Sequence, residues 1–352
     1  MPLISHSRRP PAVLVIGVLA LLLLAATLLS IMIGAAGIPL PRVFGALFGY
    51  GDDPAQLAGD QLILWSARLP RIAVAMAVGA LLALAGAIMQ GMFRNPLADP
   101  GLVGVSSGAG LASATVIVVG DRLLAGTGLQ LPFELLPVAA FFGALASTVV
   151  LHRIATHDGR TSIAIFLLGG LAIAALSNAG IGLLVFVADD QQLRDITFWL
   201  LGSLAGATWP KALALLPFLV LAVLMVPRIA RGLDLLVLGE AEAFHAGVSV
   251  QRLKILSMVL VSAATGAAVA VSGVIGFVGI VVPHLIRLAV GPAHALLLPS
   301  SMLLGAALML CADTAARTMA APAEVPIGII TAAIGAPFFL ILLLRRRAVA
   351  SL

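Results

Sequence analysis

The sequence has little charge and a single cysteine. Charged residues make up 10% of its 352 residues, whereas a typical soluble domain has about 25%. The one cysteine, Cys311, lies inside an apolar run, so an internal disulfide and a metal–thiolate cluster are both excluded. With 61% hydrophobic residues and a mean hydropathy of +1.17, the composition indicates a membrane protein rather than a soluble domain.

The sequence motifs of common enzyme classes are also absent. There is no Gly-x-Ser-x-Gly, His-Glu-x-x-His or paired-cysteine motif, so the usual hydrolase and zinc chemistries lack their residues. The only lysines, Lys211 and Lys254, belong to no phosphate-binding Gly-x-x-x-x-Gly-Lys-Ser/Thr loop. The six histidines form no i,i+4 pair, and His152 and His157 are better explained as solvated loop residues. We therefore expect no enzyme activity, no metal site and no ATP site of this kind on the chain.

The sequence instead contains a series of apolar segments near the length of about 20 residues that a helix needs to cross a bilayer. We interpret the first as a membrane span and not a signal peptide, because it exceeds the typical apolar core of about 7–15 residues. A shorter piece, 193–206, is typical of a re-entrant half-helix. We predict an all-α polytopic membrane protein, one domain over residues 1–352. The ten predicted spans are 12–34, 68–92, 102–120, 134–154, 161–188, 211–228, 252–271, 274–291, 295–318 and 326–345.

The basic residues predict the orientation of the chain. The 20 Lys and Arg residues give a net charge of +5 but form no basic stripe, so a nucleic-acid partner is not expected. If the N-terminus is cytoplasmic, thirteen of them lie inside and seven outside. Because cytoplasmic loops carry the excess of Lys and Arg, and Arg345–Arg347 would then lie inside, we predict that both termini are cytoplasmic.

Three arginines run against this rule. Arg68, Arg71 and Arg317 fall at the external ends of the second and ninth spans. They are either interfacial anchors or a docking surface for an acidic partner protein, since guanidinium groups bind carboxylates with two parallel hydrogen bonds.

Ionisable residues within the predicted spans are scarce. The best candidate, Asp313, lies four residues before Arg317, which favours a local ion pair over a proton relay. A carrier driven by protons or sodium would be expected to hold such residues in its spans. The sequence therefore favours an energy source outside the lipid.

One cytoplasmic segment, 228–254, carries more polar residues than the other loops. Within it, 235–246 is predicted to form a short surface helix that stops at Gly247. It is either a docking element for a cytoplasmic partner or a plain connection between two spans.

Several motifs resemble, in order along the chain, those of the permeases of iron-chelate, haem and vitamin B12 ABC importers, the type II importer fold. The resemblance extends from about residue 60 to the C-terminus. The matching stretches are 68–71 (RLPR), 86–90 (GAIMQ), 94–100 (RNPLADP), 104–109 (GVSSGA), 199–203 (WLLGS), 276–279 (GFVG), 283–284 (PH), 312–317 (ADTAAR), 324–328 (EVPIG) and 335–338 (GAPF).

The resemblance implies a multi-pass permease of the bacterial inner membrane that works as a homodimer with ten helices per subunit. Two separate ATPase subunits would bind ATP and hold the 235–247 segment as a coupling helix, and a periplasmic binding protein would deliver the cargo. Arg68, Arg71 and Arg317 resemble the arginines that receive this protein. The residues that resemble the cytoplasmic gate are Asn95, Leu97, Thr161 and Ser162. The coupling residues implied are Leu238, Gly239, Glu240, Ala243 and Gly247.

The cargo is predicted from residues 193–199 (LRDITFW), which look most like the haem-transporting members. Arg194 could meet the propionates of haem, because arginine suits such anions. It could equally pair with Asp189, Asp190 or Asp195. We expect haem as the transported substrate and no bound cofactor on the chain, with a ferric siderophore or cobalamin as the alternatives and an ion-coupled secondary transporter as the more distant one.

Overall fold

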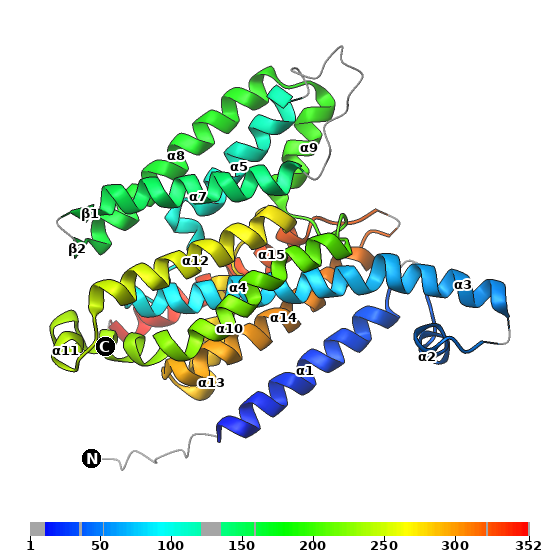
Figure 1. The fold of residues 1–352 in the computed structure, drawn as a ribbon, viewed down its shortest axis with the longest axis horizontal. Helices are drawn as coiled ribbons and strands as arrows, with labels where there is room; N and C mark the ends of the chain where they lie inside the picture. Colours follow the sequence, from blue (N-terminus) through cyan, green and yellow to red (C-terminus); the bar gives the residue numbers. More distant parts are fainter. Residues whose placement is uncertain are drawn as a thin grey trace.

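The chain folds almost entirely into helices (Figure 1). The computed structural model describes residues 11–34, 37–51, 53–120, 135–157, 160–321 and 323–350. A short hairpin of β1 (Thr156–His157) and β2 (Arg160–Thr161) pairs Thr156 with Thr161. The helices are α1 (Ala12–Met32), α2 (Leu40–Phe48), α3 (Pro54–Leu62), α4 (Leu69–Met92), α5 (Val105–Thr115), α7 (Leu135–Ala155), α8 (Ile163–Val187), α9 (Asp190–Leu201), α10 (Trp209–Leu238), α11 (Glu240–His245), α12 (Val250–Ser272), α13 (Val278–Val290), α14 (His294–Thr318) and α15 (Ile327–Ala350).

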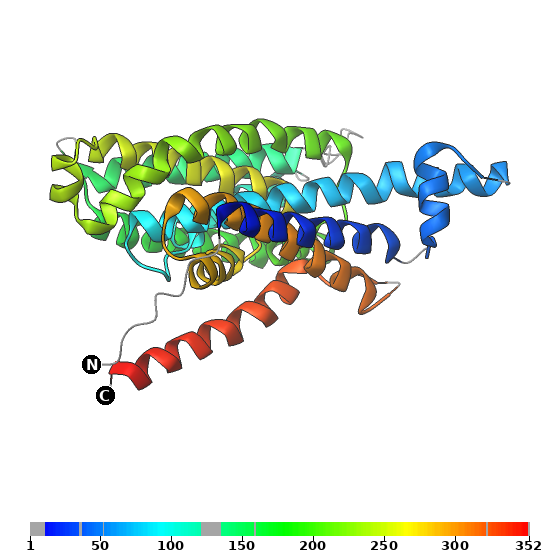
Figure 2. The ribbon, with the colours of Figure 1, turned by 90° about the horizontal axis from the view of Figure 1, so that it is seen from below.

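An apolar helix covers most of each of the ten predicted spans. Seven are long and apolar enough to cross a membrane, and three shorter apolar helices cover 105–120, 278–290 and 327–341. The all-α polytopic fold is therefore confirmed. The first residues of α1 and the last turn of α15 both lie toward the end of the molecule that carries α11 (Figures 1 and 2).

Several predicted boundaries are wrong. A π-helical turn, Ile63–Arg68, joins α3 to α4 without a break. The helix that contains the second span therefore begins well before the predicted start at residue 68. The sixth span runs on to Leu238 instead of ending at 228. The predicted surface helix 235–246 is thus two pieces, the end of α10 and the separate helix α11. Gly239, with φ of 143°, makes the break between them.

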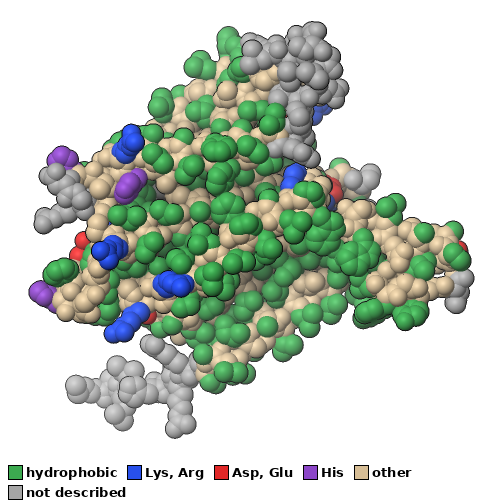
Figure 3. Space-filling view, viewed as in Figure 1, with side chains coloured by type: hydrophobic (Ala, Val, Ile, Leu, Met, Phe, Trp, Pro, Cys, Tyr) green, Lys and Arg blue, Asp and Glu red, His purple; other side chains and the backbone are tan. Residues whose placement is uncertain are grey.

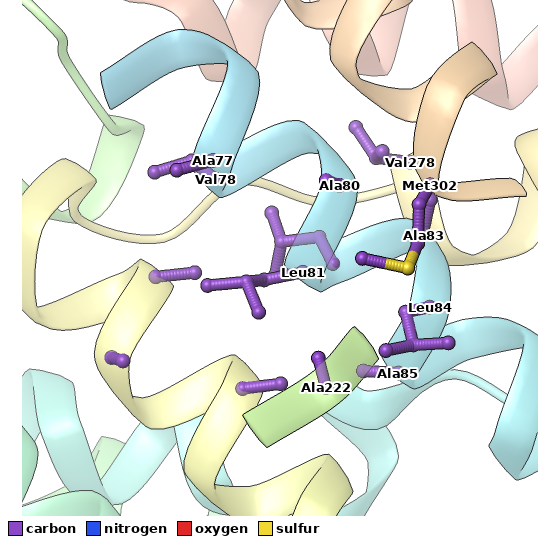
Figure 4. Close-up of a cluster of buried hydrophobic side chains, with 14 of the residues drawn as sticks. Ala77, Val78, Ala80, Leu81, Ala83, Leu84, Ala85, Ala222, Val278 and Met302 are labelled. Atoms are coloured by element: carbon purple, nitrogen blue, oxygen red, sulfur yellow. The ribbon is translucent and has the colours of Figure 1, made fainter. Parts of the chain in front are cut away.

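Helix α4 forms the centre of the core. Almost every residue from Ile72 to Met92 is buried, and α10, α12, α13 and α14 pack around it. Its core side chains are mostly alanine and leucine, seen beside Ala222, Val278 and Met302 in Figure 4. A Cβ at Gly86 would overlap the backbone of Gly279 in α13. Small residues permit this close packing, which supplies dispersion energy where lipid provides no hydrophobic drive.

The stretch after α9, the stretch after α12 and the stretch before α15 meet where these three helices come together. The Ser203 N–H donates to the Ser272 carbonyl at 2.8 Å, and the Ile327 N–H donates to the Gly202 carbonyl at 3.1 Å. Backbone polar groups at membrane depth need such protein partners. The predicted short piece 193–206 corresponds to the second half of α9 and the turn after it.

The surface is polar at one end and apolar along its length. In the view of Figure 3, most of the visible Lys and Arg side chains lie toward the end that carries α11. The face over α10 and α1 is covered mainly by hydrophobic side chains. This distribution suits a chain embedded in lipid with one strongly basic end.

Candidate functional site

The arginine cluster at the outer end of the core consists of Arg68, Arg71 and Arg317, and the structure brings all three together. Arg71 donates from Nε and Nη2 to the carboxylate of Asp313 at 2.8–3.1 Å, and from Nη1 to Glu324 at 2.8 Å. The predicted pair between Asp313 and Arg317 is confirmed, with Nε and Oδ2 3.2 Å apart. Asp313 therefore joins α14 to α4 through Arg71 and holds Arg317 of its own helix beside that contact.

The end of α1 completes the arginine cluster. Arg317 donates to the Ser30 hydroxyl at 2.9 Å, and the Arg68 guanidinium donates to the Ile31 carbonyl. A Cβ at Gly34 would stand 3.1 Å from Arg68 Nη2 and 3.5 Å from Arg317 Nη1, so the chain passes close beside both guanidinium groups. These contacts bury most of each arginine side chain.

The two carboxylates in the arginine cluster differ in exposure. The Asp313 side chain is 1% exposed, whereas that of Glu324 is 39% exposed. Three guanidinium groups against two carboxylates leave one net positive charge. Because its second acid lies at the surface, the cluster can attract another carboxylate from outside and can exchange Glu324 for it. Nothing in the sequence around Arg71 reveals these two partners, which lie more than 240 residues away.

The loop after α4 contains the predicted gate residues Asn95 and Leu97. Arg94 has a φ of 50°, its N–H donates to the Gly91 carbonyl, and the Asn95 N–H donates to the Gln90 carbonyl. This is the Schellman motif that ends helices, with arginine where glycine is usual. The exposed Asn95 then accepts a hydrogen bond from the Leu97 N–H at 3.0 Å, which fixes the turn.

The second predicted gate pair, Thr161 and Ser162, lies at the start of α8. The hydroxyl of Ser162 caps α8 at the Ile165 N–H. Thr161 is held by α12, because Gln251 bonds both its N–H and its hydroxyl, and Lys254 donates to its carbonyl at 3.3 Å. The ring of Phe93, before the first loop, contacts Phe166 of α8 with centroids 5.8 Å apart. The two gate loops are thus neighbours.

The segment after α10 lies beside these loops. Lys254 Nζ, which donates to Thr161, also forms an ion pair with Glu240 of α11 at 2.7 Å. Lys254 therefore links α11 to the predicted gate residue Thr161 through one buried ammonium group. Of the other predicted coupling residues, Ala243 is buried and Leu238 is exposed. Gly239 and Gly247 bound α11 in conformations with positive φ that glycine adopts readily.

A groove of about 1030 Å³ connects these elements at the basic end of the molecule. It brings together the loop after α4, the start of α8, α11 and the start of α12. Its charged and polar lining can receive part of another protein. Its lining includes Arg94, Thr161, Ser162, Glu240, Phe244 and Lys254.

Two polar contacts near this end were not predicted. His294, at the start of α14, bonds Asp234 Oδ1 through both its backbone N–H and Nδ1, at 2.9 and 2.6 Å. Gln90 accepts from Arg287 at 2.9 Å and donates to the Gly279 carbonyl. Both contacts join residues more than 59 positions apart, so only the fold reveals them.

Asp99, in the loop between α4 and α5, is a partly buried acid outside the spans. Its Oδ1 accepts from the Gly101 N–H at 2.7 Å. Burial raises the pKa of Asp99, and the hydrogen bond from Gly101 opposes that rise. The carboxyl thus serves as a helix cap in a place that disfavours its charge.

Arg194 is exposed on α9. Asp189, one of the acids that could have paired with it, instead caps α9 by accepting from the N–H groups of Gln191 and Gln192. Within the described ranges, no group of three or more His, Cys, Asp or Glu side chains is placed to hold a metal ion.

Comparisons with known proteins agree with this architecture. Residues 22–345 match the family model of the FecCD transport family. The hemin transport system permease HmuU of Yersinia pestis is 47% identical over 292 residues, covering 80% of this chain and 82% of the relative. The cobalamin import permease BtuC of Halobacterium salinarum is 44% identical, covering 80% and 73%. The vitamin B12 permease BtuC of Klebsiella pneumoniae is 38% identical, covering 94% and 93%.

A solved structure of a metal-chelate type ABC transporter in an inward-facing conformation is also similar. It superimposes with a TM-score of 0.81 at 34% identity, covering 94% of this chain and 99% of the other. The likeness therefore includes nearly the whole described fold.

Proposed function

Since the chain belongs to the FecCD transport family, it is the permease of a type II ABC importer for haem, cobalamin or a siderophore, and we propose that its cargo is haem. The observation that carries this choice is the higher identity to the hemin permease than to the two cobalamin permeases. The exposed guanidinium of Arg194 on α9 supports it, because haem carries two propionates and arginine binds carboxylates well.

We propose that two copies of the chain enclose the pathway. The centre of the subunit is filled by α4 and its neighbours, which leaves the space for a bulky cargo outside a single chain. Helix α15 leaves the helical body at an angle and packs on α13, α14 and the end of α9 (Figure 2). A second copy that covers α15 would place a pathway at the two-fold axis. The oligomeric state of the purified permease tests this directly.

The ATPase subunits would bind at the groove beside α11. This proposal is supported by the short helix α11, its exposed Phe244 and its ion pair to Lys254. It also accounts for the energy supply. The chain carries no phosphate-binding Gly-x-x-x-x-Gly-Lys-Ser/Thr loop of its own, so separate subunits would bind and hydrolyse ATP. With α11 and the gate residues Asn95, Leu97, Thr161 and Ser162 on the cytoplasmic side, both termini are cytoplasmic in an inner-membrane protein, in accord with the excess of basic residues there.

The arginine cluster would receive an acidic, cargo-loaded binding protein on the periplasmic side. Its support is geometric: Arg68, Arg71 and Arg317 converge at the opposite end of α4 from the gate loops. The net positive charge of the cluster attracts carboxylates and speeds encounter between the two proteins.

The test of the cargo is transport into proteoliposomes that hold the permease with its ATPase. Binding protein loaded with haem, with cobalamin or with a ferric siderophore is offered in separate reactions. ATP-dependent accumulation of haem alone supports the proposal, whereas uptake of only cobalamin or only the siderophore keeps the importer and refutes haem. Arg194→Ala should lower haem uptake severalfold while leaving assembly intact, and the matched variant Gln191→Ala on the exposed side of α9 should not.

A further inference from the structure

A groove lies between α10 and α14. Its volume is about 510 Å³, and its lining is mostly apolar. Figure 2 shows α10 and α15 on opposite faces of the helical body. The groove is lined by Val223, Val226, Pro227, Ala230, Arg231, Asp234, Ala295, Pro299 and Met302.

Proline in both walls accounts for the groove. Pro227 lies inside α10 and Pro299 inside α14. Each removes the N–H that would bond to the carbonyl four residues earlier and bends its helix there. Those carbonyls belong to Val223 and Ala295, which line the same groove. A proline and the carbonyl it leaves without a helical partner therefore lie in each wall of the groove.

The groove has the dimensions and depth of a lipid chain. From Val223 to Asp234, α10 rises about 16 Å at 1.5 Å per residue. The apolar part lies toward the middle of the span, whereas Arg231 and Asp234 lie in its last two turns. Large apolar side chains of α10 around it are exposed, such as Val220, Val223 and Leu224. This surface therefore faces lipid tails at one end and headgroups at the other.

The mouth of the groove carries one charge of each sign. Arg231 and Asp234 are three residues apart, so they share a face of α10, and both line the groove. Arg231 is exposed and forms no ion pair within the described ranges. Both bonds from His294 go to Asp234 Oδ1, so Oδ2 takes part in neither, and the Asp234 side chain is 38% exposed. A ligand that fits carries an anion and a hydrogen-bonding cation within one headgroup.

We propose that this groove binds a phospholipid with a zwitterionic primary-amine headgroup, that is, a phosphatidylethanolamine. One acyl chain fills the apolar part, the phosphate meets Arg231 and the ammonium donates to Asp234. Basic pockets between spanning helices at the cytoplasmic side are known to select lipid headgroups. Asp234 adds the choice of amine, because a quaternary choline cannot donate a hydrogen bond to it. The bound lipid steadies the end of α10 that leads into α11, and this site does not depend on which cargo the permease carries.

The test counts lipid bound to the delipidated full-length chain by native mass spectrometry. Phosphatidylethanolamine, phosphatidylcholine and phosphatidylglycerol with the same acyl chains are titrated separately. One phosphatidylethanolamine per chain should bind about tenfold more tightly than phosphatidylcholine, as expected for one charge-assisted hydrogen bond. Equal binding of the two, or tighter binding of phosphatidylglycerol, refutes the proposal.

Two variants assign the headgroup contacts. Asp234→Asn keeps an oxygen for His294 but should abolish the preference for ethanolamine over choline. Arg231→Gln should weaken all three phospholipids. Arg228→Gln is the matched control, because Arg228 is an exposed arginine one turn away that does not line the groove; it should leave binding unchanged. Ethanolamine selectivity that survives Asp234→Asn, in protein whose melting temperature matches the wild type, overturns the assignment.

Discussion

The difference in burial between Asp313 and Glu324 predicts that their two ion pairs to Arg71 contribute unequally to stability. Asp313→Asn leaves Arg71 and Arg317 without their shared buried carboxylate. Removing one partner of a buried pair costs about 3–5 kcal/mol. Glu324 is much more exposed, so solvent screens its pair with Arg71, and Glu324→Gln should cost less than about 1 kcal/mol.

Both variants can be compared by the denaturant dependence of unfolding of the purified permease in detergent. The expected order is a large loss for Asp313→Asn and a small one for Glu324→Gln. Equal losses, or a neutral Asp313→Asn, would refute the view that Asp313 anchors the arginine cluster.

Glu324→Gln also tests the docking proposal. If the binding protein places its own carboxylate on Arg71, freeing Nη1 from Glu324 should tighten binding by up to about fivefold, the worth of one exposed pair. Surface plasmon resonance with immobilised permease measures this. Weaker binding would show that Glu324 supports docking instead of competing with it.

Three further perturbations address the gate loops and the core. Lys254→Met removes the bridge from Glu240 to Thr161 and should lower the amount of cargo transported per ATP hydrolysed severalfold. Arg252→Gln in the same groove is the control. An unchanged ratio of cargo to ATP in Lys254→Met would contradict a role in coupling. Because the folded pKa of Asp99 is raised above 3.8, its contribution to stability should fall as pH rises from 3.8 through that pKa. Denaturation curves measured against pH should therefore show the wild type losing stability relative to Asp99→Asn over that range. An equal pH dependence in both proteins would contradict it. Gly86→Ala forces a Cβ against the Gly279 backbone and should lower the free energy of unfolding by about 1–3 kcal/mol. A melting temperature equal to that of the wild type would argue against close packing of α4 on α13.

The spans could be predicted because each carries its own signal of length and hydropathy. The ends of α4 and α10 could not. The helix before α4 extends out to Pro54 with polar residues such as Asp60, whose carboxylate is satisfied by Arg42 at 2.7 Å. Arg42 lies outside the apolar run, so hydropathy alone starts the span too late.

The residues of the candidate site were found by their motifs, but their contacts were not. Arg68, Arg71 and Arg317 were predicted as an outward-facing group, and the fold surrounds them with their own acids and with the end of α1. Similarly, a break was expected at Gly247, whereas Gly239 makes the first one. Both glycines can be read from the sequence. Only the backbone conformation shows that Gly239 separates two helices and that Gly247 follows the end of α11.

The close contacts of α4 limit how one subunit can change shape. Gly79 meets the backbone of Gly305, and Gly86 meets that of Gly279, so α4, α13 and α14 interlock without slack. Packed interfaces of this kind switch between discrete arrangements and do not slide gradually. We therefore expect these three helices to move as one rigid body, so that any change of shape falls to the non-helical stretches around it, such as 202–208 and 273–277. Because a Cβ at Gly202 or Gly273 would overlap neighbouring backbone, these two stretches are themselves closely fitted to each other.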